Sequence, residues 1–371
     1  MEKDGKRRLG AGSPVAPCDP GAALRESYRE PRGRDTTLNI GEIARRANVS
    51  TATVSRTLNQ TGTVRPETAR KVWRVAAELN YYPNSHARAL VSGRSRLLGL
   101  IVSDITNPFF PELVHSFEAL ATQQGYDLIL TSTGYQTARM IGCVRRMLER
   151  KVDGVAMMTS EMDLGLIKEL ARRGVPLVFM DVGRVGPRMS HVLIDYAHGI
   201  HQAVDHLAGL AHKRVAFITG PLDLHSARTR RQAFLDGMRA HRIKIDPKLV
   251  REGTHTAEGG QQAMAAILKG AKRPTAVVCS NDWTAIGALH ALDAAGLRVP
   301  EDVSVVGFDD IPLASYTRPP LTSVRTSAGD VGSTAFDALF RLIGGERLEG
   351  DMYQVPTTLV VRASTAKPKR S

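Results

Sequence analysis

The residues whose types and spacing could do chemistry form two groups, and the first is a short basic segment. Residues 37–96 hold 10 Lys or Arg and 3 Asp or Glu side chains, within a chain of 371 residues and net charge +13. Residues 97–371 carry only +4. Concentrated cationic charge attracts a phosphate backbone, because neutralising phosphates releases counterions. A charge run alone is more often a solvated face, so a DNA-binding role needs support from the elements around it.

Three short helices are predicted within this segment. Asn39 can cap the first helix, and Asn48 tolerates the left-handed backbone of a tight turn. Ser50 can cap the second helix, and Pro66 suits the first turn of the third. Apolar spacing predicts a buried side made of Ile43, Ala44, Ala47, Val54, Leu58, Val72, Val75, Ala76 and Leu79.

This arrangement is typical of a helix-turn-helix, whose second helix enters the major groove with its N-terminal residues toward base edges. Small outward side chains allow close approach, and Arg56 can bond to a guanine or a phosphate. A three-helix bundle without a DNA role is disfavoured, because the outward face is small, polar and basic. The residues expected to contact DNA are Asn39, Ser50, Thr51, Ala52, Thr53, Ser55, Arg56 and Asn59.

A further short helix is predicted from Asn84 to Gly93. About two turns of helix are too short to be stable alone in water, so this helix needs a partner. Its apolar Leu90, with Asn84 and Ala87 beside it, could be a wedge that unstacks a base step in the minor groove. A linker helix packed on the next domain explains the same pattern equally well.

The second group of candidate residues follows the ends of predicted strands. Ligands bind beyond the carboxyl ends of the strands of open α/β sheets. An arginine facing carboxylates and an amide, with aromatic rings nearby, is a usual way to recognise a hydroxylated ligand. The candidates from strand ends are Asn107, Phe109, Phe110, Asp181, Ser226, Arg228, Arg230, Asn281 and Asp309.

Each of these residues also has a structural explanation. Asn107 and Pro108 suit the N-cap and first position of a helix, although capping does not explain the two phenylalanines that follow. For Asp282 and Asp310 we favour a cap or a salt bridge. For Arg230 and Asp309 we favour contact with a ligand.

The elements that must position this second group alternate along the chain. Such alternation of strands and helices predicts doubly wound parallel sheets, and the length of this part predicts two lobes. Strands are predicted at 97–102, 128–131, 155–158, 177–180, 215–218, 276–279 and 303–308. Helices are predicted at 108–124, 138–150, 164–173, 199–210, 230–242 and 284–295. The predicted domains are a disordered arm at 1–36, the helix-turn-helix at 37–83, the short helix at 84–95 and the two lobes at 96–371.

Composition and motifs argue against several other classes of protein. No apolar run approaches the roughly 20 residues of a membrane span, and the first 36 residues lack a signal-peptide core, so we expect a cytoplasmic protein that uses no membrane. The 3 cysteines have no metal-ligand spacing, so neither a disulfide framework nor a metal is expected. The chain has no GxGxxG after the first strand, GxxxxGK[ST], GxSxG or HExxH, which argues against an enzyme and leaves no catalytic residue to propose. No cofactor is expected.

The order of motifs resembles the lactose/galactose repressor family of bacterial transcription regulators. The resemblance begins with IGEIARRANVSTATVSRTLN at 40–59 and continues through ELNYYPN at 78–84 and ARAL at 87–90. It extends through NPFF at 107–110, VDG at 152–154, GP at 220–221, ND at 281–282, VVGFDD at 305–310 and PPLT at 319–322. Each motif is weak alone, but together and in order they are specific.

The resemblance implies roles for particular residues. Thr51, Ala52 and Arg56 occupy the family's base-reading positions, and Leu90 occupies that of the leucine inserted at the operator centre. Arg230 matches the effector-binding arginine. The resemblance also adds His255 to the ligand-binding candidates, because several members place a Trp or Phe there that stacks on the ligand; this departure leaves the effector's identity open.

The implied fold is an all-α helix-turn-helix domain with a hinge helix, followed by a two-lobed domain like that of periplasmic binding proteins. The implied function is a repressor that binds a near-palindromic operator on double-stranded DNA, under control of a small, sugar-like effector. The C-terminal tail lacks leucine heptads, so a homodimer is expected rather than a coiled-coil tetramer. A purine-responsive regulator of the same fold is the alternative. A solute-binding protein is disfavoured, since it would have no cationic helix-turn-helix.

Overall fold

The computed structural model describes residues 40–59, 62–81, 94–159, 164–181, 186–345 and 349–369. The chain divides into two compact units, residues 1–84 and 85–371, which are described separately. The expectations for the arm at 1–36, for Asn39, for the short helix and for its residues Asn84, Ala87 and Leu90 lie outside the described residues.

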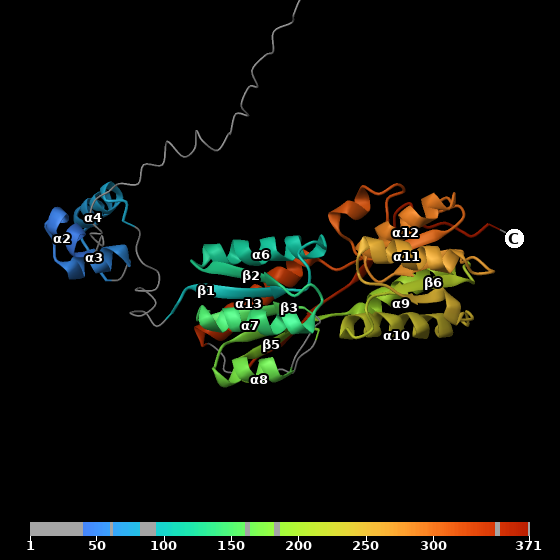
Figure 1. Cartoon of the computed structure of the whole chain (residues 1–371), viewed down its shortest axis with the longest axis horizontal. Helices are drawn as coiled ribbons and strands as arrows, with labels where there is room; N and C mark the ends of the chain where they lie inside the picture. Colours follow the sequence, from blue (N-terminus) through green and yellow to red (C-terminus); the bar gives the residue numbers. More distant parts are fainter. Residues whose placement is uncertain are drawn as a thin grey trace, which may run out of the picture. The chain divides into compact units, whose positions relative to one another are not determined.

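Over its described residues, the first unit is a cluster of three helices, coloured blue in Figure 1. They are α2 (Ile40–Ala47), α3 (Thr51–Leu58) and α4 (Pro66–Glu78). The left-handed backbone expected at Asn48, between α2 and α3, is confirmed by its φ of 50°. Pro66 is at the start of α4, as predicted. The predicted core is confirmed, since Ile43, Ala44, Ala47, Val54, Leu58, Val72, Val75 and Ala76 are buried and Leu79 packs against them.

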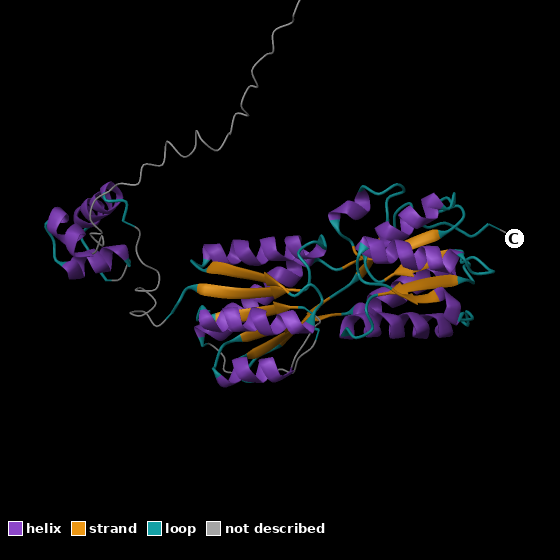
Figure 2. Ribbon diagram, in the orientation of Figure 1, coloured by secondary structure: helices purple, strands orange, loops and turns teal. Residues whose placement is uncertain are grey.

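The second unit contains two α/β lobes, each with one six-stranded sheet covered by helices (Figures 1 and 2). The first lobe has the strand order β11-β5-β4-β3-β1-β2, and every pair is parallel. Its strands are β1 (Leu97–Val102), β2 (Asp127–Ser132), β3 (Gly154–Met158), β4 (Leu177–Met180), β5 (Met189–Ile194) and β11 (Met352–Val355). Its helices are α6 (Phe109–Gln123), α7 (Thr137–Glu149), α8 (Leu164–Arg172) and α13 (Ala328–Gly344).

The second lobe has the strand order β12-β10-β9-β8-β6-β7. All of its pairs are parallel except β12 with β10, which is antiparallel and departs from the predicted all-parallel sheet. Its strands are β6 (Val215–Thr219), β7 (Val250–Glu252), β8 (Ala276–Cys279), β9 (Ser304–Asp309), β10 (Thr322–Arg325) and β12 (Thr358–Val360). Its helices are α9 (Tyr196–Gly209), α10 (His225–Ala240), α11 (Ala257–Leu268) and α12 (Asp282–Ala294), with the 3-10 turns η1 (Pro247–Leu249) and η2 (Pro312–Ser315).

Both faces of the inner strands β1, β3 and β4 of the first lobe's sheet are buried, as expected of a parallel sheet covered by helices. Along β1, the side chains of Leu98, Leu100 and Val102 join the larger apolar cluster, which contains residues of α6 and α13. Ile101 belongs to a second cluster with residues of α7. Successive side chains of β1 therefore point into one apolar cluster and then the other, which explains why the strand is a continuous apolar run in the sequence.

The backbone passes between the lobes three times, after β5, after β10 and after β11. Helix α13 follows β10 of the second lobe but packs on α6 and on β3, β4 and β5 of the first lobe. The three passages are bonded to their surroundings: the Thr357 hydroxyl donates to the Asp195 carbonyl at 2.8 Å, and the Thr326 amide donates to the Asp309 carbonyl at 3.2 Å. These segments form the hinge between the lobes.

Several helix starts differ from the prediction. Helix α10 begins at His225, five residues before the predicted start, and α9 begins at Tyr196 rather than at residue 199. Helix α6 begins at Phe109 with Pro108 as its N-cap, one residue later than expected. The Asn107 side chain still accepts a hydrogen bond, from the Phe109 amide at 3.1 Å. No helix among the described residues is long and apolar enough to cross a membrane.

Candidate DNA-reading surface and ligand pocket

The outward face of α3 is small, polar and cationic. Ser50 caps the helix, because its side chain accepts the Thr53 amide at 3.1 Å. Thr51, Ala52 and Arg56 are exposed, whereas Thr53, Ser55 and Asn59 are half-buried. Asn59 donates to the Ser55 hydroxyl at 3.2 Å, so these two side chains support each other on one face.

The cations of this unit differ in their partners. Arg45 and Arg46 both bond to Glu42, at 2.7 and 2.8 Å, and they hold the pKa of its carboxyl at about 2. Within the residues that the structure describes, five exposed cations form no such ion pair, and they are therefore available to phosphates. They are Arg56, Arg65, Arg70, Lys71 and Arg74.

A pocket lies between the two lobes of the second unit, at the carboxyl ends of the strands. Eight of its lining residues were predicted as ligand contacts: Asn107, Phe109, Phe110, Ser226, Arg230, His255, Asn281 and Asp309. The space that they enclose is about 50 Å³, whereas one water needs roughly 10–15 Å³. The pocket therefore has room for a few waters, and a sugar-sized ligand requires movement of the lobes or of side chains.

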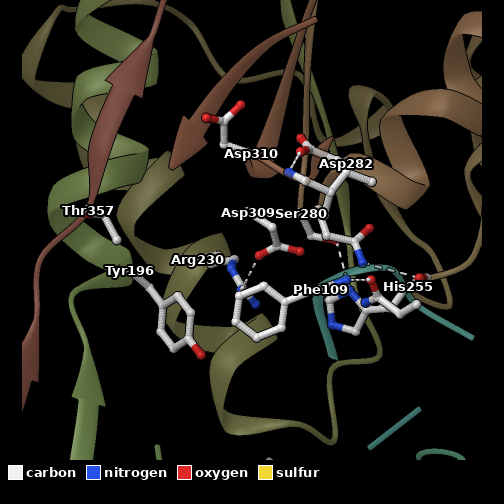
Figure 3. A network of polar contacts seen from close by, with 12 residues as sticks. Phe109, Tyr196, Arg230, His255, Ser280, Asp282, Asp309, Asp310 and Thr357 are labelled. Carbon is white, nitrogen blue, oxygen red and sulfur yellow. Dashed lines mark hydrogen bonds and ion pairs between the residues drawn. The ribbon is translucent and has the colours of Figure 1, made fainter. Parts of the chain in front are cut away.

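Arg230, on α10, is the buried cation of the pocket (Figure 3). Its guanidinium carbon lies 4.0 Å from the ring centroid of Tyr196 and 4.6 Å from that of Phe308. Stacking on two rings holds the planar group in place while leaving its edge for hydrogen bonds. Its Nε has no hydrogen-bond partner among the described residues. Such a buried orphan donor is unfavourable, so a ligand acceptor there would be strongly favoured.

Asp309 faces Arg230 from the end of β9, at 3.9 Å from Oδ1 to Nη2. Burial raises the pKa of this carboxyl to about 7, and the opposing effect of Arg230 is smaller. Asp309 also has a φ of 103°, an uncommon backbone conformation for a residue other than glycine. A long ion pair and a strained backbone are features of a binding site rather than of an optimised salt bridge.

His255 closes one side of the pocket as a neutral imidazole. Burial, and secondarily Arg230, lowers its pKa to about 3. Its Nδ1 lies 3.2 Å from the Ser280 hydroxyl, and its carbonyl accepts the Asn281 amide group at 3.2 Å (Figure 3). Gly220 makes room for the ring, because a Cβ at that position would lie 2.0 Å from His255 Nε2.

Two predicted ligand residues do not line the pocket. Asp181 is buried at the end of β4 and accepts the Tyr196 hydroxyl at 2.5 Å. Arg228 is exposed, and its Nη1 donates to the carbonyls of Leu222 and Asp223. The structure therefore places Arg228 as a support of the loop before α10, outside the lining of the pocket.

Asp310 forms the salt bridge that we favoured, whereas Asp282 has a structural role through hydrogen bonds and not through a cap, since Asn281 caps α12. Asp282 is fully buried and accepts the Ser323 hydroxyl at 2.6 Å and the Ile311 amide at 2.8 Å. Asp310 forms ion pairs with Arg325 at 2.8 Å and Arg362 at 2.6 Å.

Five further residues line the pocket that sequence analysis did not predict, namely Tyr135, Met180, Ile194, Leu224 and Tyr196. Tyr135 lies after β2, where its ring centroid is 5.7 Å from that of His255. Tyr196 is the first residue of α9, in the passage after β5. The sequence did show that most of these residues lie near the ends of β2 and β4 and near the start of α9. It could not show which of their side chains enter the pocket, because that direction depends on how the lobes pack.

Comparisons with known proteins match both units. A model described as bacterial regulatory proteins, lacI family, matches residues 39–84, and one described as a periplasmic binding protein-like domain matches residues 204–365. Proteins named HTH-type transcriptional repressor PurR are similar over 88% of this chain. The one from Aliivibrio salmonicida is 32% identical with 99% of its length covered, and one from Escherichia coli is 35% identical with 96% covered.

Solved structures give the same result. The lac repressor dimer bound to operator and the anti-inducer ONPF has a TM-score of 0.79 at 31% identity, covering 89% of this chain and 99% of that one. A complex of the transcriptional regulator CelR with cellobiose has a TM-score of 0.65 at 31% identity, covering 88% and 99%. A LacI family regulator from Enterococcus faecium with bound ribose has a TM-score of 0.67 at 28% identity, covering 73% and 99%.

Proposed function

The chain belongs to the LacI family of bacterial regulatory proteins, and from that premise we propose that it represses transcription as a homodimer on a near-palindromic operator, under control of a sugar-like effector. It is a ligand-responsive DNA-binding transcription regulator with an N-terminal helix-turn-helix and a two-lobed domain. The relatives that carry this conclusion are named as transcriptional repressors rather than as enzymes.

The α3 face supports a direct role in reading DNA. Thr51 and Ala52 leave the N-terminal end of α3 free of bulky side chains, and exposed Arg56 extends from the same face. We assign base or phosphate contacts to these three residues and to Ser50, Thr53, Ser55 and Asn59, with Asn39, Asn84, Ala87 and Leu90 outside the described residues. Leu90 is assigned the role of a minor-groove wedge.

The Arg230–Asp309 pair supports a hydroxylated effector, and this is the observation that carries the ligand class. A donor fork and a carboxyl oxygen separated by 3.9 Å can bond to neighbouring hydroxyl groups that both donate and accept. Phe109 and Phe110 contribute apolar surface on the opposite lobe, in an edge-to-face pair with centroids 5.4 Å apart. Related structures contain cellobiose or ribose.

A homodimer is supported by exposed apolar side chains on η2. Tyr316, which follows η2, is 81% exposed, and Leu313 within it is 44% exposed. A self-complementary contact between two copies would bury both. The domain boundaries that we propose are a helix-turn-helix at 37–83, a hinge helix at 84–95 and an effector-binding and dimerisation domain at 96–371.

The first experiment is selection of binding sites from random duplexes by the full-length protein. Inverted half-sites should be enriched, and affinity for them should fall steeply with salt. Arg56→Ala should weaken binding, whereas the matched change Arg239→Ala should leave it unchanged because Arg239 is exposed on α10 and paired with Asp236. Failure to enrich any sequence at several salt concentrations would contradict the DNA-binding proposal.

The second experiment is a thermal-shift screen of sugars, sugar phosphates, nucleosides and purines against the full chain. A compound that binds the folded protein but not the unfolded chain stabilises the folded state and so raises the melting temperature. A sugar that does so, and that changes operator affinity, supports the proposed effector class. A response to purines alone would replace that class with the purine-responsive alternative.

A further inference from the structure

Tyr196 occupies a special place, because it is the first residue after the backbone enters the second lobe. It begins α9 directly after Asp195, whose carbonyl accepts the Thr357 hydroxyl of another passage at 2.8 Å. Asp195 also caps α9 by accepting the His198 amide at 3.0 Å. The backbone of Tyr196 is thus anchored to the hinge between the lobes.

The side chain of Tyr196 contacts both lobes at once. On the second lobe, its ring lies 4.0 Å from the Arg230 guanidinium carbon and 5.8 Å from the Phe308 ring centroid. On the first lobe, its hydroxyl donates to Asp181 Oδ2 at 2.5 Å. Figure 3 shows the ring beside Arg230. One side chain therefore joins the cation of the pocket to the end of β4.

The contact with Asp181 is of a strong kind. Tyr196 is 4% exposed and Asp181 is 5% exposed, so water competes little for either group. Burial raises the pKa of Tyr196 well above its usual value, and the nearby carboxylate of Asp181 raises it further, so the hydroxyl keeps its proton and remains a donor. Short hydrogen bonds to a buried carboxylate are among the stronger polar contacts in proteins.

We propose that Tyr196 is a positioning residue that latches the two lobes together and couples the state of Arg230 to their relative orientation. The proposal rests on the ligand-controlled function given above and adds the residue through which control passes. An effector that bonds to Arg230 moves its guanidinium across the Tyr196 ring. The ring shifts in response, and this changes the hydrogen bond from the Tyr196 hydroxyl to Asp181. Opening of the lobes must break this hydrogen bond, so the latch has two discrete states.

The test isolates the hydroxyl from the ring. Tyr196→Phe keeps the stack on Arg230 and removes only the donor to Asp181, and Asp181→Ala removes the acceptor from the other side. Tyr353→Phe is a matched control, since its hydroxyl bonds at 3.5 Å to Asp351, and both residues lie in the first lobe.

The readout is the distance between the lobes, measured by double electron–electron resonance with no DNA or effector present. Nitroxide labels are placed at exposed positions of α7 and α10 (Arg145→Cys and Arg239→Cys) in full-length Cys18→Ser protein, diluted with unlabelled chain. Cys143 and Cys279 are buried and stay unlabelled. Each variant's melting temperature and its affinity for the duplex selected by the wild-type protein are measured alongside.

Tyr196→Phe and Asp181→Ala should each shift the ratio of lobe arrangements about tenfold, or ~1.4 kcal/mol, and the double variant should shift it no further because each change removes the same hydrogen bond. Affinity for the selected duplex should change with it, and Tyr353→Phe should match the wild type in both. A wild-type distance distribution with a lowered melting temperature would overturn the latch and leave an ordinary stabilising bond. A shifted distribution with unchanged DNA affinity would overturn the coupling. If no duplex is selected, the proposed function fails while the distances still decide the latch.

Discussion

The raised pKa of Asp309 makes a sharp prediction for the variant Asp309→Asn. The carboxyl has a pKa of about 7 in the folded protein, against 3.8 in the unfolded chain, because burial penalises its charge more than Arg230 favours it. As pH rises from about 4, the unfolded state loses this proton before the folded state does. The wild-type free energy of unfolding therefore falls with rising pH, and the decrease ends above about pH 7. Asparagine does not titrate and is free of this decrease.

The size of the effect follows from the shift. Each pH unit within that window contributes about 1.4 kcal/mol, so the advantage of the variant over the wild type should grow by about 3 kcal/mol between pH 5 and pH 8. Chemical denaturation of both full-length proteins at pH 5, 6, 7 and 8 measures the difference for the unit that contains the lobes. Asp293→Asn, at an exposed position of α12, controls for the loss of one negative charge.

A difference between wild type and variant that is the same at pH 5 and pH 8 would refute this reasoning. It would mean that Asp309 ionises as readily in the folded protein as in the unfolded chain, and that the ion pair with Arg230 at 3.9 Å compensates its burial in full. A difference that grows with pH establishes a pocket carboxyl near half-protonation at neutral pH, able either to donate to an effector or to accept from one.

Three further substitutions test other parts of the molecule. Ser50→Ala removes the cap that holds the Thr53 amide and should destabilise α3 by about 1 kcal/mol, seen as faster hydrogen exchange of its amides; unchanged exchange would show that the cap contributes nothing. Gly220→Ala places a Cβ 2.0 Å from His255 Nε2, so the ring must move. We expect strain to lower the free energy of unfolding by roughly 1–3 kcal/mol, and we expect a weaker response to the sugar found in the screen. A wild-type response would mean that the position of the His255 ring does not affect ligand binding. Arg56→Gln should reduce the slope of log affinity against log salt by about 1 if Arg56 contacts a phosphate, or relax base preference at one operator position if it reads a base. If neither effect is observed, Arg56 does not contact the operator.

The three helices of the first unit were predictable because their signals are local. Capping by Ser50, the turn at Asn48 and the start of α4 at Pro66 each depend on residues within one or two turns of helix. The buried side follows from the helical period of 3.6 residues. The proposed DNA-reading face is the side of α3 opposite the core, so predicting the core also predicted which side chains point outward.

The pocket was only partly predictable, and the missed elements show why. Helix α11 contains Gly259 and Gly260, which lower helix propensity, yet it forms because glycine lets it approach α12: a Cβ at Gly260 would lie 2.1 Å from the Thr284 carbonyl oxygen. Helix α13 follows β10 of the second lobe but packs on the first lobe, and no local sequence pattern predicts which lobe it packs on.

The sequence by itself determined the helix-turn-helix, the alternation of strands and helices, and the strand ends at which most polar pocket residues lie, because periodicity, capping and strand termination are set by neighbours along the chain. Only the tertiary structure decided which of those residues meet. Arg228 turned outward to the loop before α10 while Arg230, two residues on, turned inward, and Tyr196 reached Asp181 across the lobes. Such contacts depend on three passages of the backbone through the hinge and on the packing of two lobes. The sequence near each residue does not specify a partner that lies far away along the chain, because that contact forms only when the lobes pack.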